Sequence, residues 1–153
     1  MGEKALNRLK DLAGRQGVVI DTMIFIYLFE AHPVYADRSE EIIGRMSEGS
    51  FSGVVTPITA AELLVKPLKQ RRPSVADRYR NAIRSLPNVT LPDIDTEVAF
   101  LAGSLKAKYG MPLPDMFQAA MALCFPAQTL ITNDRAMRKV KEISVFLLDE
   151  RIR

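Results

Sequence analysis

Residues 17–29 read GVVIDTMIFIYLF, and this stretch predicts the start of an α/β fold. Its first part, Val18–Ile20, is rich in β-branched residues and indicates a short buried strand. The part after Asp21 is apolar without alternation, which is typical of a helix packed against a sheet. Asp21 therefore stands at the carboxyl end of a strand, where open α/β sheets usually place their sites. An aspartate there can also serve only to cap the following helix.

The alternation of short apolar runs with helical segments continues outward to the end of the chain. Strands are predicted in 51–56, 88–91, 129–132 and 144–148, and helices in 34–49, 57–68, 74–86, 96–110, 115–125 and 133–142. This alternation predicts a parallel β-sheet flanked by helices on both faces. Before it, the leucine spacing predicts an amphipathic helix over 4–14. We therefore expect a helical extension, residues 1–16, and a single α/β domain, residues 17–153.

The composition excludes several kinds of site. Cys124 is the only cysteine and His32 the only histidine, which excludes an internal disulfide and a zinc site built from several Cys or His ligands. His32 lies in a loop, and no nucleophile elbow accompanies it. The remaining chemistry rests on carboxylates, amides, hydroxyls and cations, which are ligands for hard metals such as Mg²⁺ or Mn²⁺.

Charge and hydropathy bear on location and partners. The amino-terminal stretch carries charges throughout, and the apolar run 23–29 is too short to span a bilayer. We therefore expect a cytoplasmic protein with no membrane partner. The net charge of +3 permits a polyanionic partner without indicating one.

The predicted topology brings acids from distant segments to one edge of the sheet. Asp21 and Asp134 each follow a strand, Glu62 lies early in the helix after the second strand, and Asp115 opens the helix before the fourth. Each alone has an ordinary explanation as a cap, a turn former, a dipole partner or a solvent-facing residue. Together they would repel one another unless a cation neutralised them, so we predict a Mg²⁺ or Mn²⁺ site that hydrolyses phosphodiesters with one or two metals.

Four segments carry a family resemblance. VVIDT at 18–22, Glu62 within TAAELL, LPDMFQAA around Asp115 and LITND at 130–134 resemble the acidic signature of PIN-domain ribonucleases. The resemblance covers nearly the whole chain from residue 17, and the size and element order are similar to the VapC-type toxin branch. It implies a PIN-like three-layer sandwich and a small, metal-dependent endoribonuclease. Met23 departs from the pattern, since the family often places a small polar residue there.

The resemblance also implies roles and partners. The catalytic and metal-binding acids would be Asp21, Glu62, Asp115 and Asp134, with Thr22, Thr132 and Asn133 supporting them. Glu62 would complete the pocket or orient the attacking water, and the other three acids would hold metal directly or through water. RNA is the implied substrate, and a homodimer and a small antitoxin protein that blocks the cleft are the implied partners.

Cations near the acids are predicted to hold the RNA backbone. They are Lys66, Lys69, Arg71 and Arg72 after the Glu62 helix, and Arg135 and Arg138 after Asp134. Such a basic run is also typical of a solvated helix end. The aromatic residues Tyr27, Phe29 and Phe117 fall in apolar helical stretches and are predicted to be core residues rather than base-stacking platforms.

Other functions on a similar fold remain open. A receiver-type domain needs a second acid beside Asp21, and a haloacid-dehalogenase-like phosphatase needs an aspartate where Met23 stands, so the sequence disfavours both. A PIN-fold nuclease of RNA processing outside a toxin system remains an alternative, as does a non-catalytic RNA- or protein-binding module.

Overall fold

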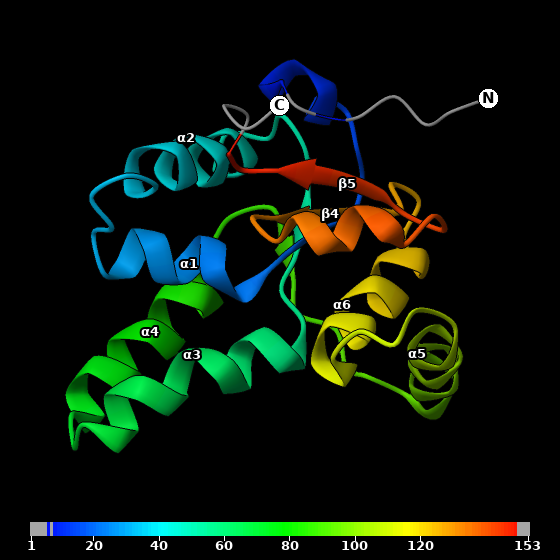
Figure 1. The fold of residues 1–153 in the computed structure, drawn as a ribbon. Coiled ribbons are helices and arrows are strands. Elements are labelled where there is room, and N and C mark those ends of the chain that lie inside the picture. Colours follow the sequence, from blue (N-terminus) through cyan, green and yellow to red (C-terminus); the bar gives the residue numbers. More distant parts are fainter. Residues whose placement is uncertain (1–5, 7, 150–153) are drawn as a thin grey trace.

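A computed structural model describes residues 6 and 8–149 and contains a five-stranded parallel sheet with helices on both faces (Figure 1). The strands are β1 (Val18–Ile20), β2 (Gly53–Val54), β3 (Val89–Thr90), β4 (Thr129–Thr132) and β5 (Ser144–Leu147). The α-helices are α1 (Thr22–Phe29), α2 (Ala36–Ser47), α3 (Pro57–Lys69), α4 (Pro73–Ser85), α5 (Thr96–Tyr109) and α6 (Leu113–Leu123). The predicted alternation is confirmed. In the part of the chain that is described, no helix is both long and apolar enough to cross a bilayer.

The sheet separates two hydrophobic cores because strand residues alternate between its faces. Val19 and Leu130 belong to the core shared with α5 and α6, whereas Val18, Ile131 and Phe146 belong to the core shared with α1 and α2. All five side chains are buried. Figure 1 shows α1 and α2 on one side of the sheet and α5 and α6 on the other. The predicted three-layer arrangement is therefore confirmed.

The strand order β3-β2-β1-β4-β5 reverses direction at the β1–β4 pair. These two strands are in parallel register, with Ile20 opposite Ile131, and the backbone nitrogen of Asp21 donates to the Ile131 carbonyl over 2.9 Å. The residues that follow β1 and β4 consequently emerge side by side. A crevice outside the carboxyl ends of the strands at such a reversal is where open α/β sheets bind ligands.

The prediction of an amphipathic helix over 4–14 is wrong for the part of this range that the structure describes, residues 6 and 8–14. Leu6 forms an isolated parallel bridge with Phe146, and the described residues up to Gly14 contain a short 3₁₀ helix, η1 (Leu9–Leu12), in place of an α-helix. Leu6 and Leu12 are both buried in the core beside α1 and α2. Because β5 lies at the sheet edge, its open hydrogen-bonding side pairs with the Leu6 backbone in place of a helical turn. Residues 1–5 and 7 lie outside the described part of the chain.

Candidate active site

Asp21 directly follows β1 and is fixed by donors from two segments. Its Oδ1 accepts a hydrogen bond from the backbone nitrogen of Thr22 over 2.8 Å, and its Oδ2 accepts one from the Thr132 hydroxyl over 2.7 Å. Burial raises the pKa of Asp21, the bonds from Thr132 and Thr22 oppose that rise, and the charge of Glu62 adds to it. Asp21 is thus the N-cap of α1 and also a buried, oriented carboxylate.

Thr132, the buried last residue of β4, joins Asp21 to Asp134. Its hydroxyl donates to Asp21 and accepts from the backbone nitrogen of Asp134 over 3.1 Å. The Oδ1 of Asp134 accepts from the backbone nitrogen of Ala136 over 3.0 Å and so caps the 3₁₀ helix η2 (Arg135–Lys139). One hydroxyl therefore sets the relative positions of two of the predicted acids.

The side chain of Asn133 contacts residues outside the acid cluster. Its Nδ2 donates to the Tyr27 hydroxyl over 3.0 Å, and its Oδ1 accepts from the backbone nitrogen of Asp149 over 3.1 Å. The amide therefore anchors the loop after β4 to α1 and to the segment after β5. This contact supports the loop that carries Asp134.

Glu62 reaches the site from the second turn of α3. Its Oε1 accepts from the Thr22 hydroxyl over 2.8 Å, and the Thr22 oxygen lies 2.9 Å from the hydroxyl oxygen of Thr59. Gln118 of α6 donates from Nε2 to Thr59 over 2.8 Å, while its Oε1 accepts from the Thr56 hydroxyl. A chain of buried polar groups thus connects α6 and α3 to the carboxylate of Glu62.

The sequence reasoning missed Thr59 and Gln118, although each had a detectable signal. Gln118 is the polar residue within the apolar segment MFQAAMA of α6, and it lies three residues after Asp115. Thr59 lies three residues before Glu62 on α3. Residues three apart share a helix face, so both polar groups could have been assigned to the faces that carry the acids.

Asp115 lies in the first turn of α6, as predicted. Its pKa is raised to about 6, first by burial and then by the charges of Asp21, Asp134 and Glu62. This repulsion requires that the three other acids lie close to Asp115. The four predicted acids therefore lie in one cluster, and within the described residues no lysine or arginine forms an ion pair with any of them.

The donor chemistry of this cluster fits a hard divalent cation. Within residues 6 and 8–149, no three Asp, Glu, His or Cys side chains converge closely enough to form a coordination shell by themselves. Mg²⁺, however, usually takes only one or two protein carboxylates directly and keeps several of its waters. Burial and the charges of the other three acids raise the pKa of Asp115, and a bound cation would relieve the repulsion among these oxygen donors.

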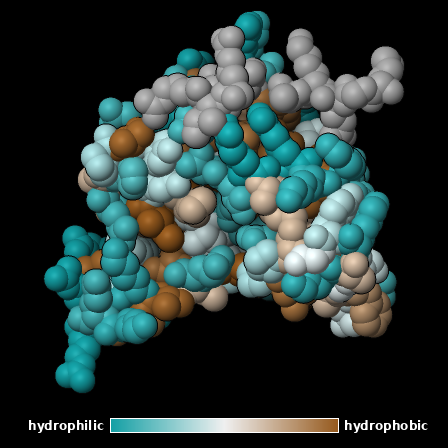
Figure 2. Space-filling view, in the orientation of Figure 1, coloured by the Kyte–Doolittle hydropathy of each residue, from teal (hydrophilic) through white to brown (hydrophobic). Residues whose placement is uncertain are grey.

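The predicted RNA-contacting cations fall into two groups, and all of them are exposed. Lys66, Lys69, Arg71 and Arg72 lie in the last turn of α3 and the turn into α4, and Arg135 and Arg138 lie in η2 directly after Asp134. Figure 2 shows hydrophilic side chains over the far end of the α3–α4 pair. The first group begins on α3, which carries Glu62, and the second lies on η2, which Asp134 caps.

Comparison with known sequences identifies the family. The family profile of the PIN domain matches residues 18–143. The chain belongs to the PIN domain family. No curated protein matches it by sequence.

Solved structures share the fold of this PIN domain. DNA-bound VapBC from Salmonella typhimurium is 17% identical with a TM-score of 0.68, covering 88% of this chain and 99% of that chain. A toxin–antitoxin complex from Klebsiella pneumoniae is 21% identical with a TM-score of 0.66, covering 87% and 98%. VapBC2 from Rickettsia felis, bound to a promoter DNA fragment, is 18% identical with a TM-score of 0.64, covering 84% and 96%. At these identities the likeness extends to the fold.

Proposed function

We propose that this PIN-domain protein is a metal-dependent endoribonuclease that hydrolyses phosphodiester bonds of RNA. The observation that carries the proposal is the cluster of Asp21, Glu62, Asp115 and Asp134, in which burial and the three other acids raise the pKa of Asp115 to about 6. Carboxylates that repel one another at the point where the strand order reverses destabilise the fold. The same carboxylates can bind a divalent cation that contacts phosphate.

Each side chain has a role in this mechanism. Asp21, Asp115 and Asp134 would hold Mg²⁺ or Mn²⁺, either directly or through water. The bound metal would supply Lewis-acid stabilisation of the scissile phosphate and an activated water. Thr132 keeps Asp21 and Asp134 in a fixed relation, which limits reorganisation on metal binding.

Glu62 is the candidate for orienting the attacking water. Its Oε1 is held by Thr22, whose hydroxyl is in turn held by the Thr59–Gln118 pair, so one carboxylate oxygen is fixed. The other oxygen has no bond to the described residues and would accept a hydrogen bond from the water. The cations of α3 and η2 would hold the RNA backbone on either side.

We further propose that the nuclease is the toxin of a toxin–antitoxin pair and works as a homodimer with an antitoxin partner. Support comes from the fold shared with chains of VapBC and other toxin–antitoxin complexes. A neighbouring short reading frame whose product copurifies with this chain and suppresses its cleavage would support the toxin role. Cleavage without any such partner would favour a nuclease of RNA processing.

The decisive experiment is cleavage of a labelled single-stranded RNA with Mg²⁺, Mn²⁺ or EDTA. We expect cutting that requires metal and that falls by about 100-fold or more in Asp115→Asn, which keeps the shape of the side chain and removes its charge. Asp93→Asn is the matched control, because Asp93 is exposed in the loop before α5. Folded wild-type protein that is inert with both metals, or that cuts equally in EDTA, would contradict the proposal.

A further inference from the structure

A polar pocket lies where the ends of α1 and α3 meet the start of α4. Its volume is about 460 Å³, and its lining includes Phe29, Glu30, Lys66, Gln70, Arg72 and Tyr79. Pockets of this size hold small ligands or single residues of a polymer. The acid cluster does not use any of these side chains.

The pocket is connected to the acid cluster along the seam between α1 and α3. Near the start of α1, Thr22 contacts Glu62 of α3 over 2.8 Å. Lys66 lies one turn further along the same face of α3, and its Nζ contacts Glu30 at the end of α1 over 2.6 Å. Four residues of α-helix advance about 6 Å along the helix axis. An RNA strand that runs from the acid cluster along this seam would therefore reach the pocket within one helical turn of Glu62.

Two cations in the pocket are available to an anionic ligand. The side chains of Lys66 and Glu30 are 62% and 35% exposed, so their ion pair is easily exchanged for another anion. Arg72 makes no side-chain ion pair with residues 6 and 8–149. Its backbone is nevertheless fixed, because its nitrogen donates to the Pro67 carbonyl over 2.8 Å in the turn that ends α3. A fixed backbone with a free guanidinium suits the recognition of phosphate.

The same pocket has an aromatic wall. The rings of Phe29 and Tyr79 stack with centroids 4.7 Å apart and an interplanar angle of 22°. Phe29 packs partly against the core, as predicted, yet it also lines the pocket together with the half-buried Tyr79. Cations beside aromatic rings match a nucleotide, which offers a phosphate and a flat base. An acidic peptide would use the cations and leave the rings without a partner.

We propose that this pocket binds one nucleotide of the RNA strand next to the scissile bond. Lys66 and Arg72 hold its phosphate, Gln70 offers an amide, and Phe29 and Tyr79 contact its base. The identity of the strand rests on the proposed nuclease function. Lys69 and Arg71, which precede Arg72 in the same basic run, do not line the pocket and are expected to contribute less.

Binding of a labelled, short 2′-O-methyl RNA in EDTA tests the pocket without cleavage. We expect Arg72→Gln and Lys66→Gln each to weaken binding about tenfold and to reduce the slope of log Kd against log salt by about 0.7, the loss of one phosphate contact. Arg45→Gln, an exposed cation of α2, is the matched control and should bind as the wild type does. Tyr79→Leu should weaken binding while leaving the salt slope unchanged, because stacking releases no counterions.

Several outcomes would contradict the proposal that this pocket binds a nucleotide of the RNA strand. Equal losses in Arg72→Gln and Arg45→Gln would mean that only overall charge matters. Adenosine monophosphate binding as tightly as the oligonucleotide would identify a mononucleotide site, and displacement by an acidic peptide at equal concentration would identify a protein-binding surface. If the wild type cleaves RNA with metal but Arg72→Gln binds RNA as tightly as the wild type, the proposed nucleotide pocket is refuted and the proposed nuclease function stands. If RNA binding depends on Arg72 but the protein does not cleave RNA under any condition, the proposed nuclease function is refuted and the proposed nucleotide pocket stands.

Discussion

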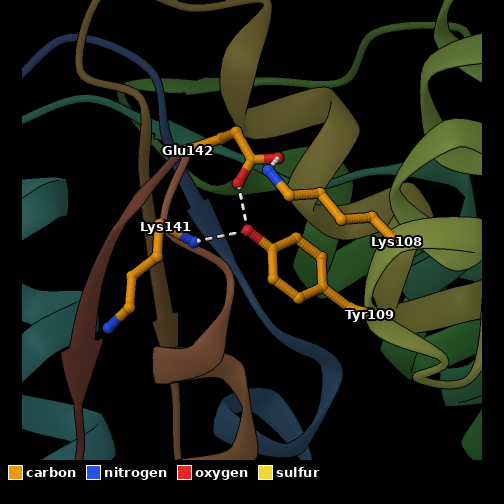
Figure 3. A network of polar contacts seen from close by, with 4 residues as sticks. All are labelled: Lys108, Tyr109, Lys141 and Glu142. Atoms are coloured by element: carbon orange, nitrogen blue, oxygen red, sulfur yellow. Dashed lines mark hydrogen bonds and ion pairs between the residues drawn. The ribbon is translucent and has the colours of Figure 1, made fainter.

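Two regions of this protein place carboxylates in opposite electrostatic environments, one that raises the pKa of a carboxyl group and one that lowers it. At the carboxyl edge of the sheet, Asp115 lies among three other acids, and burial with their charges raises its pKa to about 6. Between η2 and β5, Glu142 accepts a hydrogen bond from the Tyr109 hydroxyl and lies 3.5 Å from the Lys108 Nζ, and the bond from Tyr109 is the first cause of its lowered pKa (Figure 3). The Tyr109 hydroxyl also accepts from the backbone nitrogen of Lys141 over 3.1 Å.

The difference separates a carboxylate whose donors stabilise the fold from carboxylates that, under the proposed function, bind a cation. Glu142 receives donors from two residues at the end of α5, Lys108 and Tyr109, and so ties that end of the helix to the turn before β5. The acids at the sheet edge receive their donors from Thr22, Thr132 and the backbone nitrogen of Ala136, and these orient the carboxylates. Their remaining repulsion is what a divalent cation would relieve.

Among changes outside the four acids, the largest effect is expected from Thr132→Val, which removes the hydroxyl between Asp21 and Asp134 while keeping the shape of the side chain. Two site contacts, of 2.7 and 3.1 Å, are lost inside a buried region. We expect RNA cleavage to fall about 30-fold, which corresponds to about 2 kcal/mol for a hydrogen bond to a charged group. Thr132→Ser keeps the hydroxyl and should restore most of the activity. Equal activity in Thr132→Val and wild type would remove Thr132 from the mechanism.

A smaller effect is expected on the pH dependence of stability without metal. Between its ordinary pKa of 3.8 and about 6, folded Asp115 keeps a proton that the unfolded chain has released, so the free energy of unfolding falls as pH rises through this range. Because the carboxyl is partly open to solvent, we expect a loss of only about 1 kcal/mol between about pH 4 and about pH 6. Urea unfolding in EDTA measures it, and Asp115→Asn should lack this component. A wild type and variant with the same pH dependence would contradict the account.

Tyr109→Phe tests the other carboxylate and should affect stability alone. It removes the hydroxyl that donates to Glu142 and accepts from the Lys141 backbone. We expect the free energy of unfolding to fall by about 1 kcal/mol or less in urea unfolding, while cleavage and its metal dependence stay unchanged. A loss of cleavage comparable with that of Thr132→Val would mean that the two regions are coupled.

The fold was largely predictable because its local patterns and its packing agree. The β-branched run Val18–Ile20 forms a strand whose residues enter both cores, and Asp21 begins a helix as its position indicated. The amino-terminal segment was not predictable in this way. Leucines at helical spacing there are buried by a bridge to β5 and one 3₁₀ turn, which depends on an open sheet edge distant in sequence.

The acids of the site were predictable because strand ends and helix starts fix them to one edge. Gln118 and Thr59 were missed because their contact depends on how α6 packs against α3. The family resemblance implied that Asn133 supports the acids, whereas its amide contacts Tyr27 and the Asp149 backbone. Side-chain direction within a loop is set by tertiary neighbours, which a single sequence does not reveal.

The most direct test of the central claim is calorimetric titration of the protein with Mn²⁺ near neutral pH. The account predicts saturable binding by the wild type, at least about tenfold weaker in Asp115→Asn, and unchanged in Glu142→Gln, whose carboxylate is already satisfied by Tyr109 and Lys108. Absence of saturable binding by folded wild type, or equal weakening in both variants, would contradict the claim that the acids at the sheet edge form the metal site.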